Sequence, residues 1–311
     1  MKKIERIAIL GSGMMGHGIA QVFLGYPGYR VTMSSRHQNT LDLAPGKIEA
    51  NLKALGLPPC DLSRLRLTTS REDAVSEADI VIESITENIE LKQQLFVEVE
   101  KAAPAHCIFA SNTSVIPITA IGEKLKDKTR MIGNHWWNPP YLIPLVEVVQ
   151  TVHTSPEVIK ANMELLAAIG KKPVHVKKDV PGFVANRLQH ALWREAIYMV
   201  EVGICDAAAV DQCIQNSFGL RISALGPLEN TDMVGLEMVQ DIHRNILADL
   251  CTAKAPSPLL QKMIDENKRG WSTNLGFYEW NDESKAALRK RFLERIAVNL
   301  AAMKKEADLK K

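Results

Sequence analysis

Two residues, twelve positions apart, carry the chemistry that this chain is best suited to perform. His135 is followed by two tryptophans, and Glu147 lies inside the apolar run 145–149. A carboxylate in a strand-like run of branched residues is expected to be at least partly buried, and a buried carboxylate needs a partner. If that partner is His135, it fixes the tautomer of the imidazole and raises the basicity of the other nitrogen, which suits proton transfer near neutral pH. The alternative is a Glu147 on a solvated strand edge and a His135 that only packs in the core.

A glycine-rich turn near the start of the chain indicates a dinucleotide site. The apolar run 4–10 ends in Gly11-Ser12-Gly13-Met14-Met15-Gly16, and residues 17–24 have the pattern of a helix. Between a strand and a helix, the first glycine of this motif allows a tight turn, the second lets the backbone approach a pyrophosphate, and the third lets helix and strand pack closely. The pyrophosphate then lies at the helix N-terminus. The alternative is a glycine-rich turn without a ligand.

The end of the next expected strand bears on the choice of cofactor. An acidic residue about 20 positions after the glycines normally holds the ribose hydroxyls of NAD. Here the strand at 30–33 is followed by Ser34, Ser35 and Arg36, which offer no carboxylate. A small hydroxyl followed by Arg could bind a ribose phosphate through charge-assisted hydrogen bonds, so the sequence favours NADP over NAD. The alternative is a surface Arg beside a site that binds NAD less tightly.

Further polar residues follow two apolar runs in the middle of the expected sheet. Glu87 and Lys92 come after the first run, and Ser111-Asn112-Thr113-Ser114 comes after the second. Ligands of open α/β sheets bind outside the carboxyl ends of the strands, so these residues are expected at the same crevice as His135. For Glu87 and Lys92 a solvated pair is the alternative, and the four small polar residues could instead cap the helix that follows Pro117.

The alternation of short apolar strands with helical segments predicts an α/β fold with a parallel sheet for the first part of the chain. Strand signals stop after residues 173–176, and the stretch 177–182 separates this part from a helical remainder. We therefore expect a Rossmann dinucleotide-binding domain over residues 1–179 and an all-α domain over residues 180–311. Asn186, in the first turn of the next helix, could cap that helix or reach back across the cleft between the domains.

Length and composition exclude several classes of protein. A chain of 311 residues exceeds the size of most single cores, and a net charge of +2 gives no reason to expect nucleic acid or a membrane surface as partner. Five cysteines without a CxxC spacing indicate neither a disulfide framework nor a metal site, and they fit a reducing compartment. The chain runs from Met1 into the first strand without a signal segment or an apolar span, so we expect a cytoplasmic protein.

Together these motifs resemble those of the 3-hydroxyacyl-CoA dehydrogenase family over essentially the whole chain. The Ser-Asn-Thr-Ser motif of the family stands at 111–114, its His-aromatic-aromatic-Asn-Pro motif at 135–139 and its Pro-Gly-Phe-x-x-Asn-Arg motif at 181–187. The spacing from His135 to Glu147 also matches. The resemblance implies a Rossmann domain, a helical domain that usually forms a homodimer, and reversible oxidation of a 3-hydroxy acid or a 3-hydroxyacyl-CoA to the 3-keto product with NAD(P).

The resemblance also implies roles for single residues. His135 would be the general base that takes the hydroxyl proton while hydride leaves for the nicotinamide, and Glu147 would orient it. Ser114 and Asn186 would hold the substrate oxygen. The residues implied at the nicotinamide half of the cofactor are Glu87, Lys92 and Asn138, and Asn112 of the Ser-Asn-Thr-Ser motif is counted with them.

Three departures from the family pattern leave the substrate and cofactor open. The pair Ser35-Arg36 replaces the acidic residue of NAD-using members. The segment through which long-insert members recruit coenzyme A is short and poor in lysine, and Ser272 stands where a lysine is expected before Gly-Phe-Tyr. The stretches 138–147 and 226–229 look more like the lambda-crystallin and gulonate dehydrogenase branch, which acts on free hydroxy acids. Arg221 could then bind a substrate carboxylate through a bidentate pair, or simply face solvent.

Two other functions remain open. One is a dehydrogenase of a free sugar acid or of a ring-bearing acid, which would oxidise a primary alcohol or reduce an aldehyde with Trp137 stacked on the ring. The other is a non-catalytic, cofactor-binding protein, as some crystallins are. The joint presence of Ser114, His135, Glu147 and Asn186 argues against this second function, because binding alone needs none of them.

Overall fold

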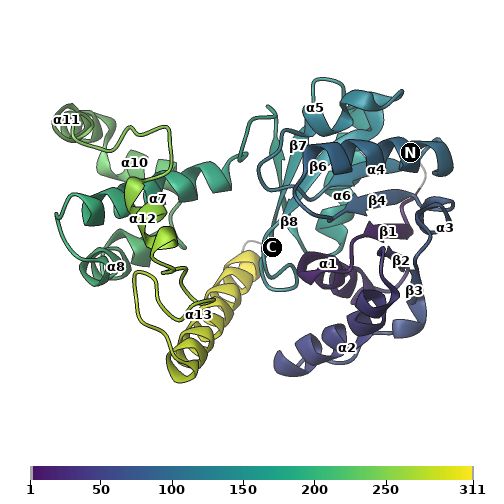
Figure 1. Cartoon of the computed structure of the whole chain (residues 1–311). Coiled ribbons are helices and arrows are strands. Elements are labelled where there is room, and N and C mark those ends of the chain that lie inside the picture. Colours follow the sequence, from purple (N-terminus) through teal and green to yellow (C-terminus); the bar gives the residue numbers. More distant parts are fainter. Residues whose placement is uncertain (1–2, 310–311) are drawn as a thin grey trace. The chain divides into compact units, whose positions relative to one another are not determined.

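The computed structural model describes residues 3–309 (Figure 1). Met1 and Lys2, from which we expected the chain to enter its first strand directly, and Lys310 and Lys311 lie outside the described residues. The chain divides into two compact units, Met1–Arg187 and Leu188–Lys311. This division falls after the first turn of helix α7 (Ala185–Glu201), whereas the predicted boundary at 179 lies in the linker before it. Glu147 accepts hydrogen bonds from the backbone N–H groups of Val184 and Ala185, which tie the start of α7 to the first unit.

The first unit is built around an eight-stranded sheet of order β3-β2-β1-β4-β5-β6-β7-β8. Its strands are β1 (Arg6–Leu10), β2 (Arg30–Ser34), β3 (Leu65–Thr68), β4 (Ile80–Glu83), β5 (Ile108–Ser111), β6 (Met131–Trp136), β7 (Leu145–Gln150) and β8 (Lys172–Val176). Strands β1 to β6 are parallel, β7 is antiparallel to β6, and β8 is parallel to β7. The strand order reverses at β1, between β2 and β4, which marks the ligand crevice of such sheets.

Helices cover both faces of the sheet, because the central strands bury side chains in both directions. In β1, Ile7 and Ile9 enter one apolar core while Ala8 and Leu10 enter the other, as strands buried on both faces do. The first core is covered by α1 (Met14–Leu24), α2 (Gln38–Ala54) and α6 (Pro156–Ala168), and the second by α3 (Arg71–Val75), α4 (Ile89–Ala102) and α5 (Ile118–Ile121). Short 3-10 turns are η1 (Leu62–Arg64), η2 (Gly122–Lys124) and η3 (Lys128–Arg130). The predicted Rossmann domain is confirmed.

The second unit is all helical, as predicted. After α7 it contains α8 (Ala207–Gln215), α9 (Phe218–Arg221), α10 (Pro227–Val234), α11 (Leu236–Ile246), α12 (Pro258–Asp265) and α13 (Asp282–Leu309), the long yellow helix of Figure 1. Among the described side chains of the second unit, Val210 is the only buried apolar one. Large apolar side chains stay exposed instead, among them Leu188 and Leu192 on α7 and Met238, Ile242 and Ile246 on α11. None of the helices in the described part of the chain has the length and apolar character of a bilayer span.

Candidate active site

His135 and Glu147 face each other on neighbouring strands. They are register partners in the antiparallel pair of β6 and β7, and His135 Nδ1 lies 2.7 Å from Glu147 Oε2. Both side chains are buried, with exposed fractions of 4% and 1%. Residues directly opposite in an antiparallel pair project from the same face of a sheet. The twelve positions that separate them are the end of β6, the connecting loop and the first residues of β7. The alternative of a solvated Glu147 is therefore wrong.

Glu147 accepts hydrogen bonds at both carboxylate oxygens. Oε2 binds His135 and, at 3.4 Å, the indole N–H of Trp137. Oε1 accepts bonds of 2.9 and 3.0 Å from the backbone N–H groups of Val184 and Ala185. Burial raises the pKa of Glu147, but the bonds from His135 and the two backbone groups outweigh this effect and lower the pKa below its ordinary value of 4.5. The carboxylate therefore stays ionised, so Nδ1 of His135 carries the hydrogen and Nε2 is left as the basic nitrogen.

Two aromatic rings contact the imidazole of His135. The ring centroids of Trp137 and Phe183 lie 5.4 and 5.5 Å from it. Phe183 is buried and has a φ of 50°, a left-handed conformation that is uncommon for residues with a side chain. Such strain persists only where surrounding contacts impose it, and it gathers at functional sites. The Pro-Gly-Phe motif thus holds a ring against His135.

Ser114 and Asn186, the predicted holders of the substrate oxygen, lie next to each other. Asn186 Nδ2 donates to the backbone oxygen of Ser114 at 3.1 Å, and the Ser114 side chain is exposed. Asn186 directly follows the two residues whose N–H groups bind Glu147. The structure therefore links these two residues to the pair of His135 and Glu147 through the start of α7.

Glu87 and Lys92 form an ion pair of 3.2 Å, but Lys92 is buried, so the alternative of a solvated pair is wrong. Lys92 Nζ also lies 2.6 Å from Oε1 of the fully buried Glu83. Burial raises the pKa of Glu87, but hydrogen bonds from Thr113 and Ser114 and the charge of Lys92 lower it overall. Lys92 lies beneath Glu87 and not at the surface, so we infer that it acts on the crevice through Glu87. Its direct contact with a cofactor stays a prediction.

Asn112 and Asn138 occupy different positions at the sheet edge. Asn112 Oδ1 accepts a bond of 2.9 Å from the backbone N–H of Trp136, and its Nδ2 lies 3.3 Å from Ser84 Oγ. This amide therefore joins the ends of β4, β5 and β6. Asn138 is exposed, two residues beyond the end of β6, where a ligand of the crevice can reach it.

The glycine-rich turn has the geometry that a pyrophosphate needs. Gly11 has a φ of 117°, and a Cβ atom there would lie 2.3 Å from the backbone oxygen of Ser84. A Cβ atom on Gly16 would lie 1.8 Å from the oxygen of Gly11. A Cβ atom on Gly13 would meet nothing within 4 Å, and Gly13 is the N-cap of α1. The first and third glycines are thus required by the fold, while the second leaves open space at a helix N-terminus, which fits a bound dinucleotide. Of the two methionines between them, Met14 is exposed and Met15 packs against the core.

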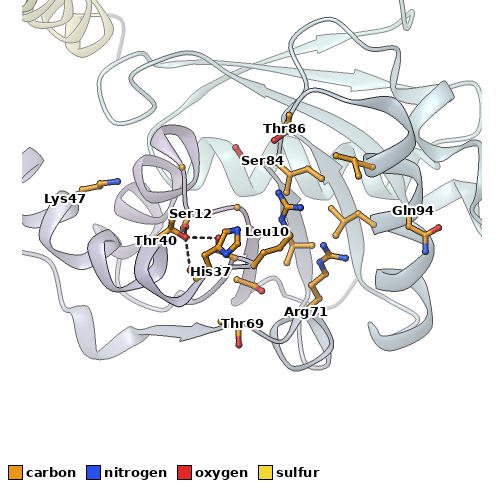
Figure 2. Close-up of a pocket in the computed structure, with 18 residues that line it drawn as sticks. Leu10, Ser12, His37, Thr40, Lys47, Thr69, Arg71, Ser84, Thr86 and Gln94 are labelled. Atoms are coloured by element: carbon orange, nitrogen blue, oxygen red, sulfur yellow. Dashed lines mark hydrogen bonds between the residues drawn. The ribbon is translucent and has the colours of Figure 1, made fainter.

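A cavity of about 400 Å³ opens beside this turn (Figure 2). Thr40 accepts a hydrogen bond of 3.0 Å from Ser12 and shares another of 3.0 Å with Ser35. The basic residues that line the cavity are Arg36, His37, Lys47 and Arg71, and no carboxylate is among the lining residues described. Arg71 is already paired with Glu98 at 2.5 Å. Arg36 is exposed and its guanidinium makes no hydrogen bond or ion pair within residues 3–309, so it is free to bind an anion.

One predicted site residue, Arg221, remains untested by the contacts of the structure. Arg221 is the last residue of α9 in the second unit and is exposed, so its contact with a substrate carboxylate stays a prediction.

Sequence reasoning missed Glu83, whose buried carboxylate binds Lys92 and, at 2.5 Å, Ser111 Oγ. The sequence feature that could have identified Glu83 is its position directly after Ile80-Val81-Ile82, because a carboxylate next to an apolar run also singled out Glu147.

The comparisons with known proteins agree with this geometry. A Rossmann sheet with a dinucleotide turn and a buried His-Glu pair at one edge has the features of an NAD-dependent dehydrogenase. Residues 6–180 match the family model of the 3-hydroxyacyl-CoA dehydrogenase NAD binding domain, and residues 182–280 match that of the 3-hydroxyacyl-CoA dehydrogenase C-terminal domain. The chain therefore belongs to the 3-hydroxyacyl-CoA dehydrogenase family and is an NAD-dependent oxidoreductase that acts on a hydroxyl group. The alternative of a non-catalytic protein is set aside.

Individual relatives cover nearly the whole chain. A 5-formyl-3-hydroxy-2-methylpyridine 4-carboxylate 5-dehydrogenase of Mesorhizobium japonicum is 35% identical over 92% of this chain and 94% of its own length. The human mitochondrial hydroxyacyl-coenzyme A dehydrogenase is 33% identical over 89% of this chain and 91% of its own length. A crystal structure of a 5-formyl-3-hydroxy-2-methylpyridine 4-carboxylic acid 5-dehydrogenase, described as an NAD+ dependent dismutase, is 35% identical, with a TM-score of 0.86 over 96% of this chain and 97% of that one.

Replacing Glu147 by Gln should destabilise the first unit. The carboxylate accepts hydrogen bonds at two oxygens, whereas the amide of Gln has one acceptor oxygen, so some of the present donors would lose their partner. We expect the free energy of unfolding near pH 7 to fall by about 1–3 kcal/mol. Because the folded state lowers the pKa of Glu147, its contribution is fully present above about 4.5 and is lost as the pH falls below that value. Urea unfolding should therefore show that the wild type has a higher free energy of unfolding than Glu147→Gln near pH 7, and that this difference becomes smaller in acid.

The matched control is Glu90→Gln, which changes an exposed carboxylate in the first turn of α4. It should leave the free energy of unfolding near that of the wild type at every pH. A gap for Glu147→Gln that stays constant down to about pH 3 would contradict the ionised state of Glu147.

Proposed function

We propose that His135 is the acid-base group of this dehydrogenase and that Glu147 orients it. The observation that supports the proposal is the bond of 2.7 Å between Nδ1 and the buried carboxylate, which leaves Nε2 basic. In oxidation, Nε2 removes the hydroxyl proton as the C–H bond of the same carbon breaks and a carbonyl forms; in reduction, the imidazolium returns the proton to the carbonyl oxygen. NAD(P), when bound, takes or gives the hydride.

The neighbouring residues position the two reactants. We assign Ser114 and Asn186 to the substrate oxygen, because the Ser114 hydroxyl is exposed beside the Asn186 amide. Asn138 and Glu87 are assigned to the nicotinamide half of the cofactor, with Lys92 supporting Glu87 from below. Holding both reactants in one orientation supplies much of the catalysis, since the cofactor carries the hydride chemistry.

The first candidate substrate is a 3-hydroxy acid or its coenzyme A thioester, as in the family at large. The second is a ring-bearing acid with an alcohol or aldehyde group. It is supported by the 35% identity to a pyridine carboxylate dehydrogenase over almost the full length of both chains. It is also supported by the half-buried ring of Trp137, whose centroid is 5.4 Å from that of His135 and which can stack on an aromatic substrate.

The deciding experiment measures oxidation of NADH and of NADPH separately with three acceptors: acetoacetyl-CoA, free 3-keto acids and pyridine carboxylates that bear an aldehyde. Saturation at low acetoacetyl-CoA concentration would place the protein among the thioester enzymes. Turnover of the free acids alone would place it in the branch suggested by residues 138–147. Absence of turnover with all three would overturn the proposed substrates.

Replacing His135 by Gln should lower kcat by about 10²–10⁴-fold with the best substrate, because proton transfer loses its base. The dissociation constant of NADH, measured by fluorescence, should change by less than about twofold, since His135 adds little to cofactor binding. His153→Gln, which alters an exposed histidine of the same unit, serves as the control and should keep kcat. Near-normal turnover of His135→Gln would remove the proposed mechanism.

We also propose that the cofactor cavity favours NADP, because its lining is basic and Arg36 is free. Replacing Arg36 by Ser should lower kcat/KM with NADPH by about tenfold or more, the loss of a charged hydrogen bond, while kcat/KM with NADH changes by less than about twofold. Lys53→Ser on the exposed side of α2 is the control. The NADP preference would be excluded if the wild type had a higher kcat/KM with NADH than with NADPH and if Arg36→Ser left the ratio of these two values unchanged.

A homodimer through the second unit is the expected assembly. Among its described side chains, the second unit buries one apolar residue and exposes many, and exposed apolar surface of this extent marks an interaction site. Sedimentation equilibrium should give about twice the chain mass of 34.5 kDa, and Ile242→Asp on α11 should shift the protein towards monomer. A wild-type monomer at micromolar concentration would contradict the assembly. The cytoplasmic location stays a prediction.

A further inference from the structure

Lys171 is a buried lysine whose ammonium group binds backbone oxygens. It follows Gly170 and directly precedes β8, and 8% of it is exposed. Its Nζ donates to the carbonyl oxygens of Pro140 and, at 2.9 Å, Ile143, and it lies 5.4 Å from the ring centroid of Trp136. These contacts all belong to β6 and to the loop that follows it.

The loop of residues 137–144 joins the two strands that carry His135 and Glu147. Its first residues are Trp137, which contacts both members of the pair, and the exposed Asn138. Neutral contacts hold other parts of the loop: Tyr141 donates to Asn51 at 3.2 Å, and the backbone N–H of residue 172 donates to the oxygen of residue 144 at 2.9 Å. Among these anchors, Lys171 is the one that brings a charge.

The surroundings of Lys171 disfavour that charge. Burial lowers the pKa of Lys171 to about 8, and no carboxylate contributes in the opposite direction. The titratable groups on the elements around it are two phenols, Tyr26, which packs against Gly170, and Tyr141 of the loop, together with His135 and Glu147, which bind each other on β6 and β7. On β8, His175 binds Gln150 and Lys172 is exposed, and the charged residues of α6 are exposed as well. A lysine kept in such a place costs folding free energy at neutral pH, which points to function and not to stability.

We propose that Lys171 is a positioning residue of the dehydrogenase site: its ammonium group fixes the loop 137–144 and with it Trp137 and Asn138 beside the reacting groups. Hydrogen bonds from a charged donor are about twice as strong as neutral ones, and Lys171 directs them at two carbonyls of one loop. The inference rests on the proposed function, but Lys171 itself takes no part in proton or hydride transfer.

The test compares Lys171→Met with Lys172→Met. The first variant keeps an unbranched apolar side chain over Trp136 and removes the ammonium group, whereas the second removes an adjacent, exposed lysine. Lys171→Met should lower kcat by about tenfold through misplacement of the loop, with the dissociation constant of the cofactor within about threefold of the wild type because the adenosine end is intact. Lys172→Met should match the wild type in both.

The pH dependence of substrate oxidation separates a positioning role from a merely structural one. Oxidation needs an unprotonated base, so loss of a proton from the general base cannot cause kcat to fall in alkali. The kcat of the wild type and of Lys172→Met should fall as the pH rises through about 8, where Lys171 loses its proton. Lys171→Met should lack this fall. A wild type without the fall, or a Lys171→Met variant that retains it, overturns the proposal.

Hydrogen exchange of residues 138–144 keeps the test independent of the substrate. Exchange should be faster in Lys171→Met than in Lys172→Met, and equal exchange overturns the proposal. If Lys171→Met fails to fold, the pH dependence of the wild type still tests the proposal, because a wild-type kcat that does not fall in alkali overturns it. Absence of turnover by the wild type with every acceptor would instead refute the proposed substrates, and the exchange comparison would still report on the loop.

Discussion

A single buried carboxylate, that of Glu147, joins three parts of the first unit. It is paired with His135 across β6 and β7, and its other oxygen binds two backbone N–H groups at the start of α7. These donors keep the carboxylate ionised in an apolar run, and the charge in turn fixes the proton on Nδ1. The strained Phe183 and the amide of Asn186 flank the same two N–H groups, so the positions of the ring and of the contact between Asn186 and Ser114 depend on this carboxylate as well.

Two further groups of buried charge lie near the same edge of the sheet, Lys92 with Glu83 and Lys171, and they are satisfied differently. Lys92 and Glu83 compensate each other at 2.6 Å and support Glu87 from below. Lys171 has only carbonyl oxygens and a ring to bind. A buried pair recovers much of its desolvation cost, whereas a lone ammonium recovers less. The apolar cores on the two faces hold the fold together, whereas these buried charges cost desolvation free energy at the edge of the sheet where His135 and Glu147 lie.

Local patterns explain why much of the fold could be predicted from the sequence. The Gly11–Gly16 turn and the alternation of apolar runs depend on neighbours in the chain, and a Glu inside an apolar run indicates a buried partner. The antiparallel direction of β7 and the burial of Lys92 depend on which strands become neighbours in space. The contacts of Lys171 with a loop about 30 residues away in the chain depend on the same topology, so no pattern around that lysine could reveal its role.

The two ends of the crevice are built from different elements. The dinucleotide turn and the basic cavity use the start of α1 and the ends of β2, β3 and β4, while His135 and Glu147 lie on β6 and β7. Arg36 makes no contact with the residues around His135 within the described part of the chain. A change at the adenosine end can therefore alter the choice between NAD and NADP without moving His135. For the same reason, the preference of a relative for one cofactor indicates little about the chemistry at His135.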